Sequence, residues 1–481
     1  MYKVLVLVPH PDDEINVAGN LFKWFKDAKA HVTVAIVTNG DYISALTKKR
    51  QEEALNAKRI LGYENLVYLG YGDGYKGVHL YHNEGNTVVE SVAGFSSTYN
   101  VSNECPAFHY TKYNEQTAYT RNHLKSDLKD LILDVTADLI VCVDNDKHPE
   151  HRCLSLIFDE VMGELIKEQN YRPYVLKAFA YIGVYDSVRD FFTYPAVQTL
   201  PAYQGTLADE VCVFPYLWEE RKCIKTPREN INSSFWKSPI FKALLAHHSQ
   251  RAACRFDQIL NADSVYFQRR TDSLTYNCKV EVSSGDKSYL NDFKIVDYDN
   301  ICDNRWEENG SLEHSWHPKA DDIHPFVEYT FKNVQYLNEV VIYQNKTSKL
   351  SVIHVVSDLG YDKLVEVNNS YKISIMFDVG TEATKLKLYF IGENIQINEI
   401  EIYENKVEDI LEKFRLPKSL GGNDISVGNK YLLYKCMYFI FKLIYMDKEL
   451  FFKRIKFKLL HKSKRLRVYT LHNSKKAVTA D

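Results

Sequence analysis

The chain opens with the stretch that decides its fold, Lys3-Val4-Leu5-Val6-Leu7-Val8-Pro9-His10-Pro11-Asp12-Asp13-Glu14. The run from 4 to 8 is aliphatic and uncharged, which is typical of a strand buried on both faces of a parallel sheet. It ends in a polar turn with one imidazole and three carboxylates. Open α/β sheets place their ligand sites at the carboxyl ends of strands. His10 and Asp13 are spaced to bind one metal ion, which would leave Asp12 as a base.

Strands and helices alternate through the first half of the chain. We expect strands at 4–8, 31–38, 66–69, 137–143 and 175–185, from runs of β-branched and aliphatic residues. Apolar residues at helical spacing predict helices at 14–29, 45–61, 124–132, 153–168 and 239–259. This order predicts βαβ units and an α/β fold with a Rossmann-like, doubly wound, mostly parallel sheet.

The pattern changes near Arg269–Asp272, where we place a domain boundary. Short alternating segments at 279–282, 326–331, 339–343, 351–356, 385–389 and 395–403, separated by turn residues, predict an all-β sandwich. The last part is helical and basic. We therefore expect a first domain at 1–270, a sandwich at 273–405 and a basic helical tail at 406–481.

Composition narrows the class of protein. The 481 residues are 45% hydrophobic and 26% charged, as in a globular protein. Nine scattered cysteines without a C-x-x-C pair argue against a disulfide framework and a thiolate metal site. No signal-peptide pattern and no apolar run of about 18 residues is found, so we expect a cytoplasmic protein without a membrane span.

A second polar turn follows the strand expected at 137–143. It contains His148 and His151, and Pro149 suits the first position of a helix. Two His and one carboxylate are a common ligand set for catalytic zinc, which lowers the pKa of a bound water to about 7. Asp12 would accept a proton from water, and the His that is not a ligand would stabilise an oxyanion or protonate a leaving group. The alternative is two unrelated polar loop ends.

These motifs resemble those of the PIG-L/LmbE-like zinc-dependent de-N-acetylases. Residues 9–14 resemble the family's HPDDE signature, and residues 148–152 resemble its HPDHR element. Two further elements occur in the family's order. They are the R-x-x-E-x-x-x-A helix (Arg50, Glu53, Ala57) and the late K-x-x-x-x-H-x-S-Q helix (Lys242, His247, Ser249, Gln250). The resemblance covers residues 1–260.

The resemblance implies a role for each matched residue. It makes His10, Asp13 and His151 the zinc ligands, Asp12 the general base and His148 the residue that stabilises the intermediate or protonates the amine. Residues assigned to substrate binding are Arg50, Asp73 and His247.

Three of these positions have other interpretations. Arg50 could form a surface pair with Glu52 or Glu53, and His247 could lie on a helix packed against the sheet. The family usually has Asp where this chain has Glu150. If that carboxylate orients His148, the extra methylene would move it.

A long segment without regular pattern, 81–120, would lie over the strand ends. It could form a substrate-specificity lid whose rings stack on sugar faces; the alternative is a disordered surface insertion. Its aromatic residues include Tyr81, Phe95, Tyr99, Phe108, Tyr110, Tyr113 and Tyr119.

The sandwich resembles a discoidin-like, galactose-binding-like module. Trp316, the alternating stretch 326–331, the turn 357–361 and the closing strand 398–403 carry this resemblance. It implies glycan binding through loop aromatics, with Trp306, Trp316 and His317 as candidates. The alternative for at least one Trp is a place in the core.

The tail has a charge of its own. From Lys406 to the end there are 18 Lys or Arg and 7 Asp or Glu, on a chain with net charge −3. Residues 431–446 are mostly apolar or aromatic, and 449–467 mix aromatic with basic side chains. Such segments lie at membrane interfaces, so peripheral contact at the inner face of a membrane is one interpretation, and docking on the body is the other. The apolar anchors argue against nucleic-acid binding.

The sequence as a whole predicts a Zn²⁺-dependent deacetylase. Its substrate would be the 2-acetamido group of an N-acetyl-hexosamine in a glycoconjugate, for instance a lipid-linked precursor of the cell envelope. The alternative is a glycan-binding or scaffolding protein with an inactive deacetylase-like domain.

Overall fold

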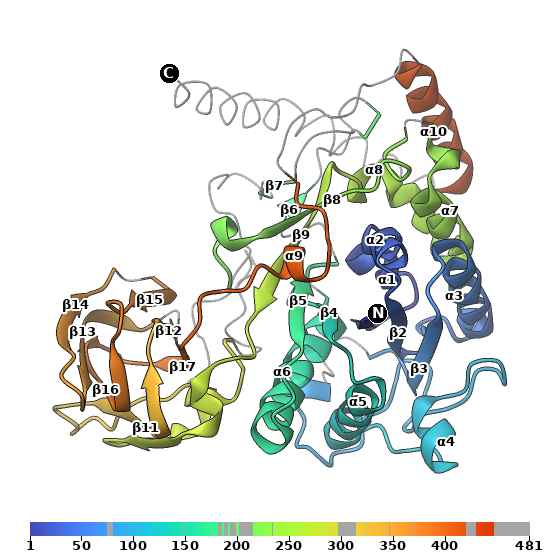
Figure 1. Ribbon diagram of the computed structural model, residues 1–481. Helices are drawn as coiled ribbons and strands as arrows, with labels where there is room; N and C mark the ends of the chain where they lie inside the picture. Colours follow the sequence, from blue (N-terminus) through green and yellow to red (C-terminus); the bar gives the residue numbers. More distant parts are fainter. Residues whose placement is uncertain are drawn as a thin grey trace, which may run out of the picture.

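The computed structural model describes most of the chain (Figure 1). The described residues are 1–74, 80–146, 148–180, 185–186, 191–192, 199–201, 215–232, 234–296, 314–345, 347–368, 370–419 and 430–446. Trp306 and the basic segment 449–467 lie outside them.

The first domain is built on a seven-stranded sheet in the order β3-β2-β1-β4-β5-β9-β8. The first five strands in this order are parallel, and β9 and β8 complete the sheet antiparallel. This confirms a doubly wound, mostly parallel sheet. The strands are β1 (Lys3–Val8), β2 (His31–Thr38), β3 (Asn65–Tyr71), β4 (Leu139–Val143), β5 (Tyr174–Ala178), β8 (Lys222–Lys225) and β9 (Asp263–Arg269).

Helices follow the parallel strands and bury their apolar sides against the sheet. The side chains of β1 and β4 between Val4 and Val8 and between Leu139 and Val143 are fully buried, as expected of strands covered on both faces. The helices are α1 (Asp13–Ala18), α2 (Leu21–Asp27), α3 (Thr47–Leu61), α4 (Phe108–Tyr113), α5 (Arg121–Val135), α6 (Pro149–Gln169), α7 (Pro239–Ala246) and α8 (Phe256–Ile259). A separate two-stranded ribbon pairs β6 (Tyr185–Asp186) with β7 (Leu200–Pro201).

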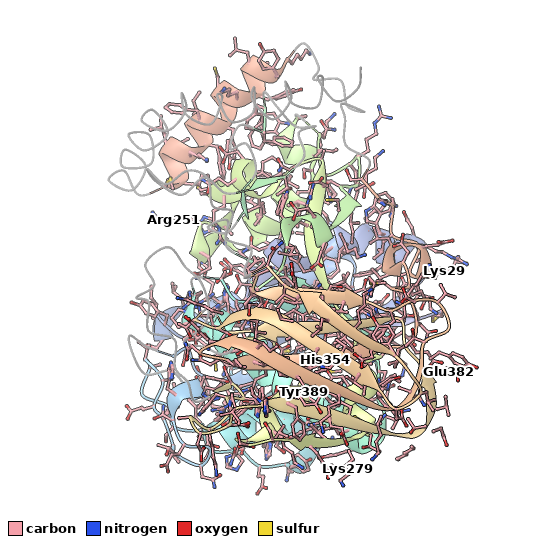
Figure 2. The ribbon with its side chains drawn as sticks, turned by 90° about the vertical axis from the view of Figure 1, so that its left-hand side faces the viewer. Lys29, Arg251, Lys279, His354, Glu382 and Tyr389 are labelled. Atoms are coloured by element: carbon pink, nitrogen blue, oxygen red, sulfur yellow. The ribbon has the colours of Figure 1, made fainter. Side chains whose placement is uncertain are left out.

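The second unit is a β-sandwich of a five-stranded sheet, β10-β11-β16-β13-β14, and a three-stranded sheet, β15-β12-β17. Its core is apolar and includes the fully buried Trp316. Figure 2 shows the outer face of the larger sheet, where His354 and Tyr389 lie side by side, with ring centroids 5.6 Å apart. The strands are β10 (Lys279–Val282), β11 (Phe326–Tyr336), β12 (Glu339–Gln344), β13 (Lys349–Ser357), β14 (Asp362–Glu366), β15 (Lys372–Met376), β16 (Glu382–Glu393) and β17 (Ile397–Tyr403).

The sandwich is joined to the first domain by buried polar contacts. Arg269, at the end of β9, donates to Glu401 Oε1 of β17 at 2.9 Å and to the Phe293 carbonyl at 2.8 Å. Both side chains are about 2% exposed. The residues at the expected boundary therefore form part of the contact between the two units.

After the sandwich, the chain returns to the first domain. Side chains of α9 (Ile410–Lys413) and the residues after it, including Phe414 and Leu416, are buried in the core of the first domain. Helix α10 (Tyr431–Tyr445) then packs beside α7 and α8, at the opposite end of the first domain from the sandwich (Figure 1). None of the helices in the described ranges has both the length and the apolar character needed to cross a membrane.

Three sequence expectations differ from the structure. The helix expected at 239–259 ends at Ala246, because His247 leaves helical geometry and Arg251 is left-handed with φ 51°. The helix expected at 14–29 is divided between α1 and α2 at Gly19 and Asn20. Strands β8, β9, β14 and β15 were not expected. Three of them, β8, β14 and β15, are short strands at a sheet edge, which give little periodic signal, and β9 lies between β5 and β8.

Candidate metal centre and active site

The two polar turns meet at the edge of the sheet where strand order reverses. Strand β1 pairs with β2 on one side and with β4 on the other, so the turns after β1 and β4 lie next to each other. This is the topological switch point at which open α/β sheets bind ligands. The sequence-based prediction that both turns open on one edge is confirmed.

The three expected ligands lie together, with two imidazoles facing one carboxylate oxygen. Oδ2 of Asp13 lies 2.9 Å from Nδ1 of His10 and 3.1 Å from Nε2 of His151. His10 and Asp13 are buried, and His151 has no exposed surface. His148 is close too: it offers a ring nitrogen within 4.8 Å of nitrogens of His10 and His151. Two imidazole nitrogens facing one carboxylate are the donor chemistry that zinc prefers.

Asp146 contacts both histidines of the second turn. Its Oδ2 lies 2.7 Å from Nδ1 of His151, and its Oδ1 accepts from the backbone N–H of His148 at 2.8 Å. A carboxylate on the far nitrogen sets the tautomer of a ligand His and aims the other nitrogen at the metal position. Sequence reasoning missed this residue, although Asp144-Asn145-Asp146 directly follows β4.

The buried charges shift each other's protonation. Burial alone would lower the pKa of His10 and His151, but neighbouring carboxylates outweigh it. Glu150 and Asp13 hold the pKa of His10 well above 6.5, while Asp146 and Asp13 raise that of His151 to about 9. The pKa of Asp13 is held well below 3.8 by both imidazoles, against the effect of burial. Proton release is therefore expected to accompany metal binding.

The Glu150 carboxylate contacts His10. Its Oε2 is 2.6 Å from Nε2 of His10 but 3.9 Å from Nδ1 of His148, and its Oε1 accepts from the Gly74 N–H at 2.5 Å. The Glu150 carboxylate therefore lies closer to His10 and to the turn after β3 than to His148.

Asp12 is held in an unusual backbone conformation. Its φ of 105° lies in the left-handed region, which costs a residue with a side chain about 1–3 kcal/mol. Glu14 Oε2 accepts from the Asp12 N–H at 2.8 Å, and Nη2 of Arg255 donates to Asp12 Oδ2 at 2.5 Å. Sequence reasoning did not find Arg255, which is 243 residues away in the chain.

His148 is the most exposed member of the group, with 30% of its side chain accessible. It caps α6, and its Nδ1 accepts from the Glu150 N–H at 3.3 Å. In the neutral ring the proton is then on Nε2, because the accepting nitrogen carries none.

Arg50 lies buried between the turns after β1 and β2. It donates to the Gly40 carbonyl at 3.0 Å and to the Pro11 carbonyl at 3.1 Å, and lies 3.7 Å from Asp73. A Cβ on Gly40 would be 2.8 Å from the Arg50 guanidinium. The suggested surface pair with Glu52 or Glu53 is therefore wrong; Glu53 instead accepts from Ser249. Contact between Arg50 and substrate stays a prediction.

His247 is placed beneath the first turn instead of at its surface. It has no exposed surface, and its Nε2 is 2.8 Å from Oε1 of Glu14, the residue that holds the Asp12 N–H. The structure gives it a supporting position instead of the expected contact with substrate.

Asp73, by contrast, has a carboxylate oxygen available. Its Oδ2 accepts from Tyr42 N–H at 3.0 Å, while its buried Oδ1 has no hydrogen-bond partner among the described residues.

The segment over the strand ends is packed, not a detached insertion. The Tyr99 N–H donates to the Gly70 carbonyl at 3.1 Å, and its hydroxyl donates to Asp41 Oδ2 at 2.9 Å. Phe95 stacks on Tyr99, with ring centroids 4.0 Å apart. Asp41 also accepts from Asp73 N–H at 2.5 Å. Tyr81 and Tyr119 are buried, whereas Tyr110 and Tyr113 are exposed. Phe95 and Tyr99 are therefore linked to Asp41 and Asp73, which follow β2 and β3.

Residues 5–162 match the PIG-L family. The family's description is GlcNAc-PI de-N-acetylase, and the match contains both polar turns. The resemblance expected from the sequence is thus confirmed for this part of the chain. No curated protein matches the chain.

Two kinds of solved structure are among those similar to the chain. One is an N,N'-diacetylchitobiose deacetylase from Pyrococcus horikoshii, at 19% identity and TM-score 0.24, over 35% of this chain and 52% of that one. The other group contains family 32 carbohydrate-binding modules of Clostridium perfringens, which match the sandwich. One module is 19% identical, and the match covers 28% of this chain and 100% of the module. A second module, solved in complex with galactose, is 15% identical, and the match covers 26% of this chain and 93% of that module. Both have a TM-score of 0.20. Trp316 is buried in the sandwich core, so it does not bind glycan at the surface, whereas His317 is exposed.

Proposed function

We propose that the protein is a metal-dependent N-deacetylase that removes the acetyl group from an acetamido sugar. One observation supports this most strongly. At the switch point of a domain that matches the PIG-L family, a strained Asp12 lies beside His10, Asp13 and His151, with the more exposed His148 next to them.

The residues present fit a zinc ion. His10, Asp13 and His151 would hold it, since their donor atoms already face one another and Asp146 orients the second imidazole. When bound, zinc would polarise the amide carbonyl and lower the pKa of a water molecule.

Asp12 is the proposed general base. Arg255 occupies its Oδ2, and no hydrogen bond from a described residue reaches Oδ1. Oδ1 can therefore accept the proton of the attacking water, while the Glu14 contact holds the backbone N–H of Asp12.

His148 is proposed to stabilise the oxyanion. With Nδ1 accepting from the backbone, its Nε2–H can donate a hydrogen bond to the oxyanion, while the proton that Asp12 took from water passes to the departing amine. The amide C–N bond breaks, acetate leaves and the sugar keeps a free amine.

Substrate recognition is proposed for the groups around the third strand end. Oδ1 of Asp73 can accept from a sugar hydroxyl, and the Phe95–Tyr99 stack offers apolar surface beside it. Arg50 would act on substrate mainly by fixing the turns. The sandwich, whose solved relatives include a module bound to galactose, is proposed as a second carbohydrate-binding unit.

A lipid-linked glycoconjugate is the substrate class that we favour, with the protein peripheral at the inner face of a membrane. The support is the outer side of α10, where Ile444 is 73% exposed and no acidic residue occurs. Lys or Arg number eleven and Asp or Glu three in the following residues, 447–481, and such segments gain about 1 kcal/mol per basic residue at an anionic surface. The exposed apolar residues of α10 are Leu432, Leu433, Met437, Phe439, Ile440, Leu443 and Ile444.

The decisive experiment measures zinc content and acetate release on the purified full chain. Substrates are free N-acetyl-glucosamine, its oligomers and a lipid-linked form. We expect one zinc per chain and acetate release that falls by about 100- to 10,000-fold in Asp12→Asn, as for loss of a general base. Asp321→Asn, at an exposed sandwich position, is the matched control and should keep full activity.

Two outcomes would decide against the proposal. A wild-type protein that contains no zinc, or that releases acetate no faster than Asp12→Asn, would favour a glycan-binding protein with an inactive domain. Co-sedimentation with anionic vesicles, with and without Ile440→Gln/Ile444→Gln, tests the membrane contact separately; equal binding by both proteins would exclude the α10 face.

A further inference from the structure

Arg255 connects the base to a part of the chain far outside the matched family domain. It is the last residue of the 3-10 helix η6 (Ala252–Arg255), and its Nη2 donates to Asp12 Oδ2 at 2.5 Å. The segment around it has little regular structure of its own, since α8 is only four residues long. Helices this short are not stable alone, so the position of Arg255 depends on what packs against 252–259.

Helix α10 binds this segment on both sides of Arg255. The Tyr438 hydroxyl donates to the Ala253 carbonyl at 2.7 Å, and Nζ of Lys442 lies 2.6 Å from Asp257 Oδ1. All of these side chains are buried. Met446, which follows the helix, packs against Cys254. Residues 253, 254 and 257 are thus contacted by side chains spaced four residues apart, at 438, 442 and 446, in α10 and just after it.

The ring of Tyr438 also completes an aromatic cluster. Its centroid is 5.2 Å from those of Phe192 and Phe235 and 6.1 Å from that of Phe256, the residue after Arg255. Phe256 in turn contacts Phe241 of α7 at 5.3 Å. The inner side of α10 is therefore part of the core that supports the segment, while its outer side faces away.

We infer that Arg255 is a positioning residue for Asp12, and that α10 keeps it in place through Tyr438 and Lys442. This inference rests on the proposed function, because it assigns Asp12 the role of base. Arg255 ties one oxygen of Asp12 and leaves the other directed to water. Loss of the α10 contacts lets Arg255 withdraw, and Asp12 then rotates out of reach of the reacting water without any change in the substrate contacts.

The kinetic test replaces the contacts while keeping bulk. The variant Tyr438→Phe/Lys442→Met/Asp257→Asn removes both polar contacts and leaves no lone buried charge. We expect kcat to fall by about 10- to 100-fold, the range for a displacement near 1 Å, with KM unchanged. The control, Tyr336→Phe/Lys349→Met/Asp321→Asn, makes the same replacements at exposed sandwich positions and should keep wild-type kcat.

Arg255 is tested directly by Arg255→Ala and Arg255→Lys. The kcat of the Ala variant should fall to a similar extent and recover in part with added guanidinium ion. The Lys variant keeps the charge but lacks the planar guanidinium group, so its kcat should lie between those of wild type and the Ala variant. A rise in KM with kcat unchanged would overturn the positioning role. So would the absence of rescue by both Lys and guanidinium.

Hydrogen–deuterium exchange separates this inference from the proposed function, because it needs no activity. Amides of 252–258 should exchange at least about tenfold faster in the triple variant than in wild type and control, as expected when a local segment opens more often. Unchanged protection there would overturn the inference even if the protein is an active deacetylase. If wild type proves inactive, faster exchange would still establish that α10 holds the Arg255 segment.

Discussion

The first domain and the sandwich bury different kinds of side chain. At the strand ends of the first sheet, imidazoles and carboxylates are packed together away from water. The core between the two sandwich sheets is built from apolar residues and one Trp. Its buried acids, Glu399 and Glu401, lie on β17, where Glu401 accepts from Arg269 of the first domain and Glu399 accepts from Tyr276. Burying charged groups costs desolvation free energy. Their concentration at one edge of the sheet is therefore typical of a functional site.

The largest expected effect comes from removing a ligand. In His151→Ala, Asp13 and Asp146 lose the imidazole between them, so we expect zinc to be lost together with activity. The metal-free variant should also be less stable by about 3–5 kcal/mol, as for a broken buried pair. Metal analysis and urea unfolding of the metal-free proteins check this. The control is His317→Ala, at an exposed sandwich position, and a variant that retained zinc would contradict the ligand assignment.

The sandwich should respond in the opposite way. Ile353 is fully buried on β13, so Ile353→Ala should lower the free energy of unfolding by about 2–5 kcal/mol while kcat on a soluble N-acetyl sugar stays unchanged. Ile391→Ala, at a position 52% exposed on β16, should cost less than about 0.5 kcal/mol. If kcat fell with Ile353→Ala under conditions where the protein is folded, the two units would not be separable in function.

A smaller effect is expected from Asp146, which contacts the proposed ligand His151. Asp146→Asn keeps the size of the side chain but removes its charge from Nδ1 of His151. Zinc affinity should weaken by about 10- to 100-fold, the usual range for such a partner. Competition with a chelating dye measures it. An unchanged affinity would mean that the backbone alone orients His151.

The smallest effect concerns Glu399, two residues before Glu401 on β17. Burial first, and then Asp292 and Glu401, raise the pKa of Glu399 well above its usual 4.5. A carboxyl that holds its proton more tightly when folded makes the protein less stable as pH rises above its unfolded pKa. Thermal unfolding of wild type should therefore lose more stability between pH 5 and pH 8 than that of Glu399→Gln. Parallel pH profiles would contradict the shift.

The sequence was informative where periodicity and local motifs coincide. Strand β2 was predicted without error, and the two polar turns were placed at one sheet edge because the carboxyl ends of parallel strands lie together. It was uninformative where a side chain is fixed by a distant partner. Arg255 meets Asp12, and His247 meets Glu14, through contacts between residues more than 230 positions apart. No local pattern contains such a pairing.

The return of residues 410–416 and of α10 to the first core has a consequence for synthesis. The first domain lacks these pieces until the ribosome has made the whole sandwich and residues up to 446. At 5–20 residues per second, roughly 10 to 35 s pass between residue 270 and that point. During this interval the aromatic surface around Phe241 and Phe256 is uncovered, so the nascent chain is expected to need a chaperone at this stage. A fragment ending at 270 would remain in that condition.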